Sequence, residues 1–167
     1  MEYPTLVMID QSLYNEKDKF LLEYVIAHET AHQWWYSVIG NDEISEPWLD
    51  EALTEYSTVL YFEEKYGKEV GSKLIKTMEM QTKNRSSEDI FKATTQYKNS
   101  IDYSLSVYTK GALAFNEVRN KVGDEVFFET LKEYYNTYMF QNVNGAKFVD
   151  LWNKKGIDID KIISEYK

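Results

Sequence analysis

Apolar residues recur at intervals of three and four along most of the chain, which is the period of an amphipathic α-helix. Glycine stops lie at Gly40, Gly67 and Gly123, and the chain contains only 7 Gly and 2 Pro to interrupt helices. The pattern therefore predicts a mainly α-helical fold. The predicted helices cover about 17–39, 45–67, 68–83, 105–122 and 124–138, with two short closing helices at 147–154 and 160–166.

Two segments depart from this period. Residues 3–9 are β-branched and apolar, with Pro4 near their start, so we expect a short N-terminal edge strand there. Residues 84–100 are polar and lack a clear period, which predicts a surface loop. Neither segment divides the chain, and we expect residues 1–167 to form a single unit.

Composition narrows the possible functions. The net charge of −9 argues against a nucleic-acid partner, because a basic surface is missing. No apolar run approaches the roughly 18 residues of a membrane span, and the first residues do not resemble a signal peptide. The count of 0 Cys excludes disulfides and thiolate metal sites, and it slightly favours a reducing, cytoplasmic location.

The sequence has only 2 His, and both fall in the segment His28-Glu29-Thr30-Ala31-His32. Residues four apart lie on one face of a helix, so both imidazoles can bind one zinc ion. Glu29 lies beside that face, where it can reach a metal-bound water. Two buried histidines can also simply satisfy each other, but a random placement sets them four apart only about once in 85 arrangements.

A catalytic zinc ion takes three protein ligands and keeps one open position, so a third donor is needed. Glu51 follows His32 after 18 residues, in the segment Trp48-Leu49-Asp50-Glu51-Ala52 at the start of the second helix. That interval allows the first helix to end and the chain to return antiparallel to it. We expect Glu51 to be the third ligand. Glu55, one turn further, is a candidate to orient a ligating imidazole, or else a solvated surface residue.

These motifs resemble the aminopeptidase N family of gluzincin metallopeptidases, peptidase family M1. The resemblance includes Gln33 and Trp34 directly after the histidine motif, and the segment Tyr108-Thr109-Lys110-Gly111-Ala112. It implies the helical part of a thermolysin-like (zincin) catalytic domain with one Zn²⁺ ion, in which Glu29 is the general base. In that family the tyrosine equivalent to Tyr108 stabilises the oxyanion.

The first residues resemble the end of the family's Gly-x-Met-Glu-Asn motif, whose glutamate binds the free α-amino group of the substrate. The resemblance implies this substrate-binding role for Glu2. The chain departs from the family pattern at Tyr3, which replaces Asn, at Asp50, which also replaces Asn, and at Ala52, which replaces Gly.

The resemblance further implies that residues 1–167 are the catalytic, zinc-binding portion of a larger metallopeptidase, packed against its other domains. The expected reaction is removal of N-terminal residues from peptides that have a free N-terminus. Two alternatives stay open: an endopeptidase or a relative of the glycyl aminopeptidases, and a zinc-binding fragment without activity of its own.

Overall fold

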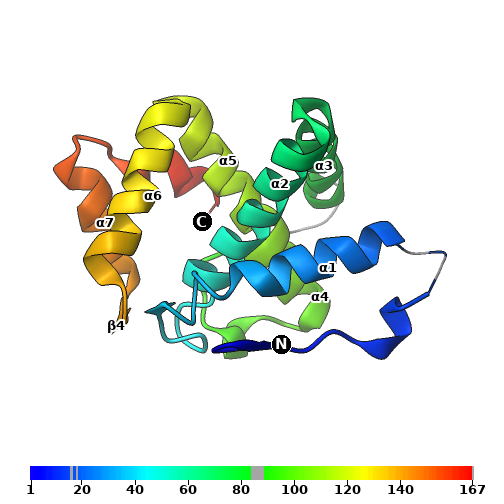
Figure 1. Ribbon diagram of the computed structural model, residues 1–167. Coiled ribbons are helices and arrows are strands. Elements are labelled where there is room, and N and C mark those ends of the chain that lie inside the picture. Colours follow the sequence, from blue (N-terminus) through cyan, green and yellow to red (C-terminus); the bar gives the residue numbers. More distant parts are fainter. Residues whose placement is uncertain (16, 18, 84–88, 167) are drawn as a thin grey trace.

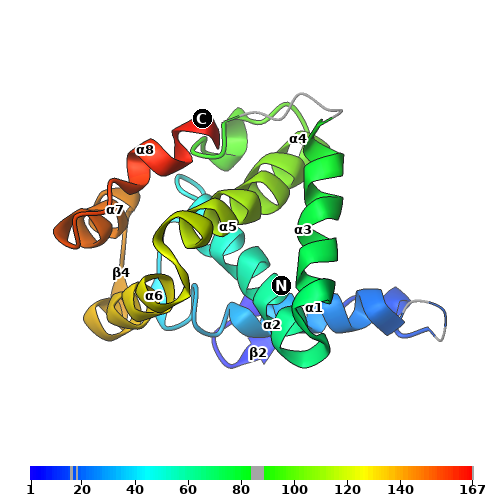
Figure 2. The same ribbon diagram turned by 90° about the horizontal axis from the view of Figure 1, so that it is seen from above.

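The computed structural model describes residues 1–15, 17, 19–83 and 89–166, and within them it confirms the mainly α-helical fold (Figures 1 and 2). In this described part of the chain, strands are confined to four pairs of residues, which form two separate two-stranded sheets. The predicted loop begins at 84–88, which lie outside the described residues. Within the described residues no helix has both the length and the apolar content needed to cross a membrane.

The N-terminal segment is a hairpin and not the single strand that its composition predicts. Strands β1 (Glu2–Tyr3) and β2 (Leu6–Val7) pair antiparallel, with Glu2 opposite Val7. Between them Thr5 adopts a φ of 66°, which reverses the chain after Pro4. The apolar run was long enough for one strand, but the turn at Pro4 and Thr5 divides it. A short 3-10 helix, η1 (Gln11–Leu13), follows.

The first long helix is shorter than predicted. Helix α1 (Lys19–Ala31) ends eight residues before the expected stop at Ile39. The chain then turns, with the Ser37 amide donating to the His32 carbonyl at 3.0 Å and Tyr36 at a φ of 126°. This turn leads into β3 (Ile39–Gly40), which pairs in parallel with β4 (Gln141–Asn142) about a hundred residues later. The periodicity gave no sign of a pairing over so long a separation.

The second predicted helix begins as a π-helix, η2 (Trp48–Ala52), and continues as α2 (Leu53–Tyr66). A second π-helix, η4 (Ser104–Lys110), lies between the short α4 (Ser100–Tyr103) and α5 (Gly111–Val122), so the helix expected at 105 begins five residues earlier. A 3-10 turn, η3 (Thr94–Gln96), interrupts the predicted loop.

The remaining helices follow the predictions closely. Helices α3 (Lys68–Lys83) and α6 (Asp124–Tyr138) have the expected bounds. Helix α7 (Gly145–Lys154) begins two residues early, where Asn144 caps it by accepting a hydrogen bond from the Lys147 amide. Helix α8 (Ile159–Ile163) and the 3-10 turn η5 (Ser164–Tyr166) complete the chain.

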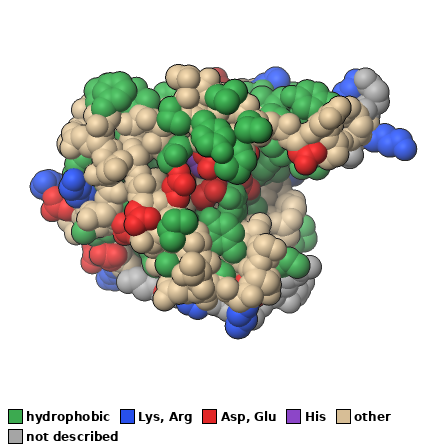
Figure 3. Space-filling model, turned by 90° about the horizontal axis from the view of Figure 1, so that it is seen from below, with side chains coloured by type: hydrophobic (Ala, Val, Ile, Leu, Met, Phe, Trp, Pro, Cys, Tyr) green, Lys and Arg blue, Asp and Glu red, His purple; other side chains and the backbone are tan. Residues whose placement is uncertain are grey.

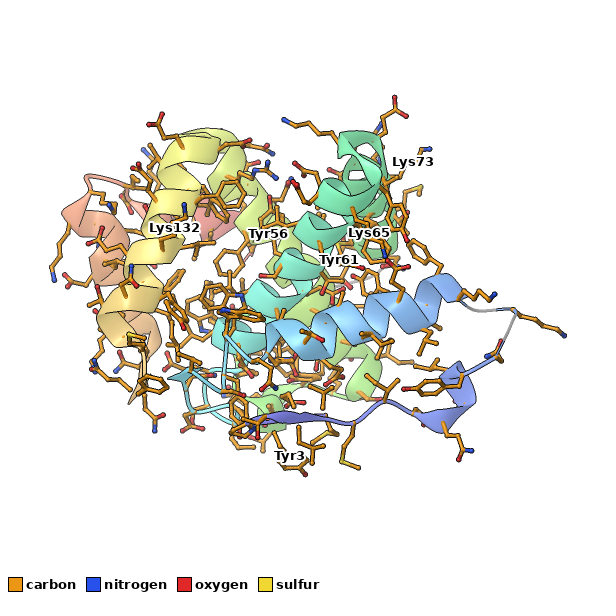
Figure 4. All side chains as sticks on the ribbon, in the orientation of Figure 1. Tyr3, Tyr56, Tyr61, Lys65, Lys73 and Lys132 are labelled. Atoms are coloured by element: carbon orange, nitrogen blue, oxygen red, sulfur yellow. The ribbon has the colours of Figure 1, made fainter. Side chains whose placement is uncertain are left out.

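Helix α2 is the central element, in contact with α1, α3 and α5 (Figure 2). Its buried face includes Tyr56 and Phe62, both fully inaccessible to solvent. At its outer end, Tyr61 and Lys65 donate hydrogen bonds to Glu23 of α1 at 2.9 and 2.8 Å (Figure 4). Together the core and this surface cluster hold α1 against α2, and so position it relative to η2, which is continuous with α2.

Candidate metal centre

Three of the predicted site residues converge on one point between α1 and η2. His28 lies in the last turn of α1, His32 directly after it, and Glu51 on η2. The Nε2 atoms of the two histidines are 3.2 Å apart. Glu51 Oε2 lies 3.3 Å from Nε2 of His28 and 3.1 Å from Nε2 of His32. Ligands about 2.0–2.1 Å from a tetrahedral zinc ion stand about 3.3 Å from one another. The triangle of donor atoms therefore has the size that such an ion requires.

Hydrogen bonds orient both imidazole rings from the opposite side. Nδ1 of His28 donates to Glu55 Oε2 at 2.9 Å, because an ionised carboxylate can only accept. Nδ1 of His32 donates to the Trp35 carbonyl at 3.0 Å, and the Thr54 hydroxyl lies 3.2 Å from it. With one hydrogen on Nδ1, Nε2 of each ring is the nitrogen that can lose its proton and offer a lone pair to a metal ion. This is the tautomer that a metal ligand needs.

The ionisable groups of the triangle strongly perturb one another. Burial opposes a charge on His28, but the carboxylates of Glu51 and Glu55 outweigh it and raise the pKa of His28 to about 10. Burial also opposes ionisation of Glu51, but both histidines outweigh it and lower the pKa of Glu51 to about 2. The site therefore favours a negative carboxylate and a positive charge held between the rings, whether that charge is a proton or a metal ion.

Glu29 and Glu2 line the same cleft, which has a volume of about 330 Å³. The backbone nitrogen of Met1 lies 2.5 Å from Glu29 Oε2 and 3.5 Å from Glu2 Oε2. The start of β1 therefore lies beside both carboxylates. Figure 3 shows acidic side chains gathered at the centre of this face, surrounded by hydrophobic ones.

Tyr108, on η4, lines the same cleft. Its ring stacks on that of His28 with centroids 5.6 Å apart, and its hydroxyl donates a hydrogen bond to Glu51 Oε1. Burial, and then the charge of Glu51, raise the pKa of Tyr108. The hydroxyl is therefore a hydrogen-bond donor at neutral pH. The structure brings Tyr108 to the ligand triangle from a segment 57 residues away from Glu51.

Sequence reasoning missed two contributors. The hydroxyl of Tyr24 donates to Glu55 Oε1, so Glu55 is held on both oxygens. Tyr24 precedes His28 by four residues, and this spacing on a helix was the available signal. Asp50 is buried beside Glu51 and accepts a hydrogen bond from Asn41 at 2.8 Å. Burial, and then the charge of Glu51, raise the pKa of Asp50 to about 7.

Similarity to known proteins extends over nearly the whole chain. Residues 1–166 match the profile described as "Peptidase family M1 domain". The chain is 26% identical over 156 residues to endoplasmic reticulum aminopeptidase 2 of Bos taurus, and 29% identical over 150 residues to aminopeptidase N of Lactococcus lactis subsp. lactis. The alignments cover 89% and 85% of this chain but only 16% and 17% of those proteins, so the chain spans about a sixth of their length.

The fold is also similar to that of the M1 zinc metallopeptidase of Deinococcus radiodurans. In a mutant of that enzyme bound to a Tyr-Ser-Ala substrate, the match has a TM-score of 0.77 at 22% identity and covers 95% of this chain and 34% of that one. Another structure of the same enzyme matches with a TM-score of 0.73, over 86% of this chain and 32% of that one. Because the profile match spans nearly every residue, this chain belongs to peptidase family M1.

Proposed function

We propose that this chain is the catalytic, zinc-binding portion of a larger aminopeptidase that removes N-terminal residues from peptides. In this proposal His28, His32 and Glu51 hold one Zn²⁺ ion. The observation that carries it is the triangle of two Nε2 atoms and one carboxylate oxygen, with edges of 3.1–3.3 Å. The relatives named above are called aminopeptidases, and the solved structures are described as zinc metallopeptidases.

When bound, zinc would lower the pKa of a coordinated water toward about 7 and polarise the scissile carbonyl. Glu29 would accept a proton from the attacking water and then donate it to the leaving amine. Two features support this role: Glu29 is adjacent to His28 in sequence, and its carboxylate faces the cleft without being part of the ligand triangle. Glu29 can therefore act as the base without also serving as a zinc ligand.

Tyr108 would donate a hydrogen bond to the oxyanion that forms as the water attacks. Its raised pKa keeps the proton on the hydroxyl, which an oxyanion-stabilising donor requires. In this structure the same hydroxyl donates to Glu51 Oε1, so the bond would move from the ligand carboxylate to the substrate during the reaction.

Glu2 would bind the α-ammonium group of the substrate, which gives the enzyme its requirement for a free N-terminus. Support comes from the cleft, which Glu2 lines together with Glu29 and the three proposed zinc ligands. Residues 1–167 match only 16–17% of the length of the aminopeptidases named above. In the larger protein, residues outside this portion would therefore contribute to the substrate side-chain preference and would form the domains against which it packs.

The decisive test compares the Glu29→Gln variant with the unchanged protein for zinc content and for hydrolysis of an aminoacyl p-nitroanilide. We expect unchanged zinc content and a rate lower by about 10²–10⁴-fold, because the base is lost and the ligands are kept. Glu64→Gln, an exposed glutamate on α2, is the matched control. Undiminished hydrolysis by Glu29→Gln would exclude Glu29 as the base.

The same assay distinguishes the alternative functions. Cleavage of N-acetylated peptides as readily as free ones would favour an endopeptidase over an aminopeptidase. Zinc binding without turnover in this chain, together with turnover in a longer one, would show that these residues bind the metal but need additional domains for activity.

A further inference from the structure

Gln33 connects the candidate metal centre to the N-terminal hairpin. Its Oε1 accepts a hydrogen bond from the Thr5 amide at 2.8 Å, and its Nε2 donates to the Tyr3 carbonyl at 3.1 Å. One side-chain amide thus engages the backbone on both sides of the turn. Tyr3, labelled in Figure 4, marks the hairpin strand that runs beneath α1.

The turn that Gln33 engages has an unfavourable backbone conformation. Thr5 has a φ of 66°, a region that is uncommon for residues other than glycine and more so for β-branched ones. Such conformations persist where surrounding contacts determine them. Pro4 has no backbone N–H and so cannot donate a hydrogen bond within the turn. The Gln33 side chain instead bonds to the residues on either side of Pro4 and so stabilises the turn.

Both ends of this connection are next to site residues. Gln33 directly follows His32, and Tyr3 directly follows Glu2. We infer that Gln33 is a positioning residue that fixes the distance between the Glu2 carboxylate and the metal-binding histidines. The inference rests on the proposed function, because it assigns the consequence to binding of the substrate's free amine.

The expected consequence is selective. Loss of the Gln33 amide should release the hairpin and move Glu2 but leave the triangle in place. His28 is held by α1, Glu51 by η2, and His32 by its hydrogen bond to the Trp35 carbonyl. Affinity for a ligand with a free amine should fall, whereas affinity for zinc and for the same ligand with a blocked amine should not. A general loss of folding would lower all three.

The test uses Gln33→Met, which keeps the length of the side chain and removes both hydrogen bonds. Gln141→Met is the matched control, because Gln141 also donates a side-chain hydrogen bond to a backbone carbonyl, that of Thr137, at 3.0 Å. Three quantities are measured: zinc affinity by chelator competition, the affinity of the zinc-loaded protein for leucinamide and for N-acetylleucinamide, and hydrogen exchange of the Thr5 amide.

For Gln33→Met we expect zinc affinity within about twofold of the unchanged protein, leucinamide binding about tenfold weaker, unchanged N-acetylleucinamide binding and faster exchange at Thr5. Gln33→Glu keeps the acceptor for the Thr5 amide but loses the donor to Tyr3, and should be intermediate. Gln141→Met should change none of these quantities.

Two results would count against different claims. Preserved discrimination between the two amides in Gln33→Met, or unchanged exchange at Thr5, would overturn the positioning role of Gln33 while leaving the proposed function intact. Equal binding of the two amides by the unchanged protein would overturn the amine-binding role of Glu2, and with it this inference.

Discussion

Glu55 Oε2 lies 2.9 Å from Nδ1 of His28, on the side of the imidazole opposite to the nitrogen that faces Glu51. The other oxygen of Glu55 accepts from Tyr24, so the carboxylate is held in place before it orients the ring. Carboxylates in this relationship to a ligating histidine fix its tautomer and strengthen metal binding.

Replacement of Glu55 by Gln should therefore weaken zinc binding by about 10–100-fold, because the ring loses its charged partner but keeps its place. Chelator competition measures the affinity. Glu64→Gln on the same helix, where the side chain is exposed, is the control and should bind zinc normally. Equal affinities in the two variants would mean that Glu55 does not support the metal.

Tyr108→Phe separates two roles of the hydroxyl. If the hydroxyl stabilises the oxyanion, kcat should fall by about 10²–10³-fold with zinc affinity nearly unchanged. Tyr138→Phe, on α6, is the control. A large loss of zinc affinity with little further loss of kcat would instead show that the hydrogen bond to Glu51 serves to position the ligand.

The stability of the chain stripped of metal should depend on pH through His28. Its folded pKa is raised from 6.5 to about 10, so its contribution is complete below pH 6.5 and is lost as the pH rises through 10. Glu51, lowered from 4.5 to about 2, contributes above pH 4.5 and loses that contribution as the pH falls through 2. Between pH 4.5 and 6.5 both His28 and Glu51 contribute fully to the free energy of unfolding.

Urea unfolding in the presence of chelator should accordingly give a lower free energy of unfolding at about pH 9 than at about pH 6, by a few kcal/mol. Excess zinc should reduce the difference, because the metal replaces the proton between the rings. Glu55→Gln should also reduce it, since one of the two carboxylates that raise the pKa of His28 becomes neutral. A difference that zinc and Glu55→Gln both leave unchanged would assign the pH dependence to other groups.

Gly111→Ala tests the close packing behind the site. A Cβ at Gly111 would lie 2.4 Å from the Cβ of Ala52, so α5 and η2 would have to separate. We expect a loss of about 1–3 kcal/mol in the free energy of unfolding, with weaker zinc binding because Glu51 is adjacent to Ala52. Gly71→Ala, whose new Cβ would lie 3.0 Å from the Glu63 side chain, should cost less and leave zinc binding unchanged.

The sequence was most informative where a local period governs the structure. The bounds of α3 and α6 follow from amphipathic spacing and from the glycine stops at Gly67 and Gly123, both of which have a positive φ. The proximity of His28 and His32 likewise follows from four residues on a helix. The position of Glu51 beside them was expected from the 18-residue interval.

The remainder depends on contacts between distant segments. The end of α1 at Ala31 coincides with a turn that leads to β3, and β3 pairs with a strand about a hundred residues away. The N-terminal hairpin depends on Thr5 at a positive φ, which its sequence does not suggest. Tyr24 was missed because a tyrosine on an amphipathic helix usually reads as a core residue.

Both π-helical stretches carry a proposed catalytic-site residue, Glu51 on η2 and Tyr108 on η4, and the two stretches contact each other. A π-helix closes its hydrogen bonds over one residue more than an α-helix does, so each stretch holds one residue more than a regular helix would need. Removal of Ala52, the one residue between Glu51 and α2, would permit an ordinary α-helix there, while rotating Glu51 by roughly 100° relative to α2. The number of residues in η2 therefore sets the direction in which Glu51 projects. We expect this one-residue deletion to preserve the helices and still abolish zinc binding.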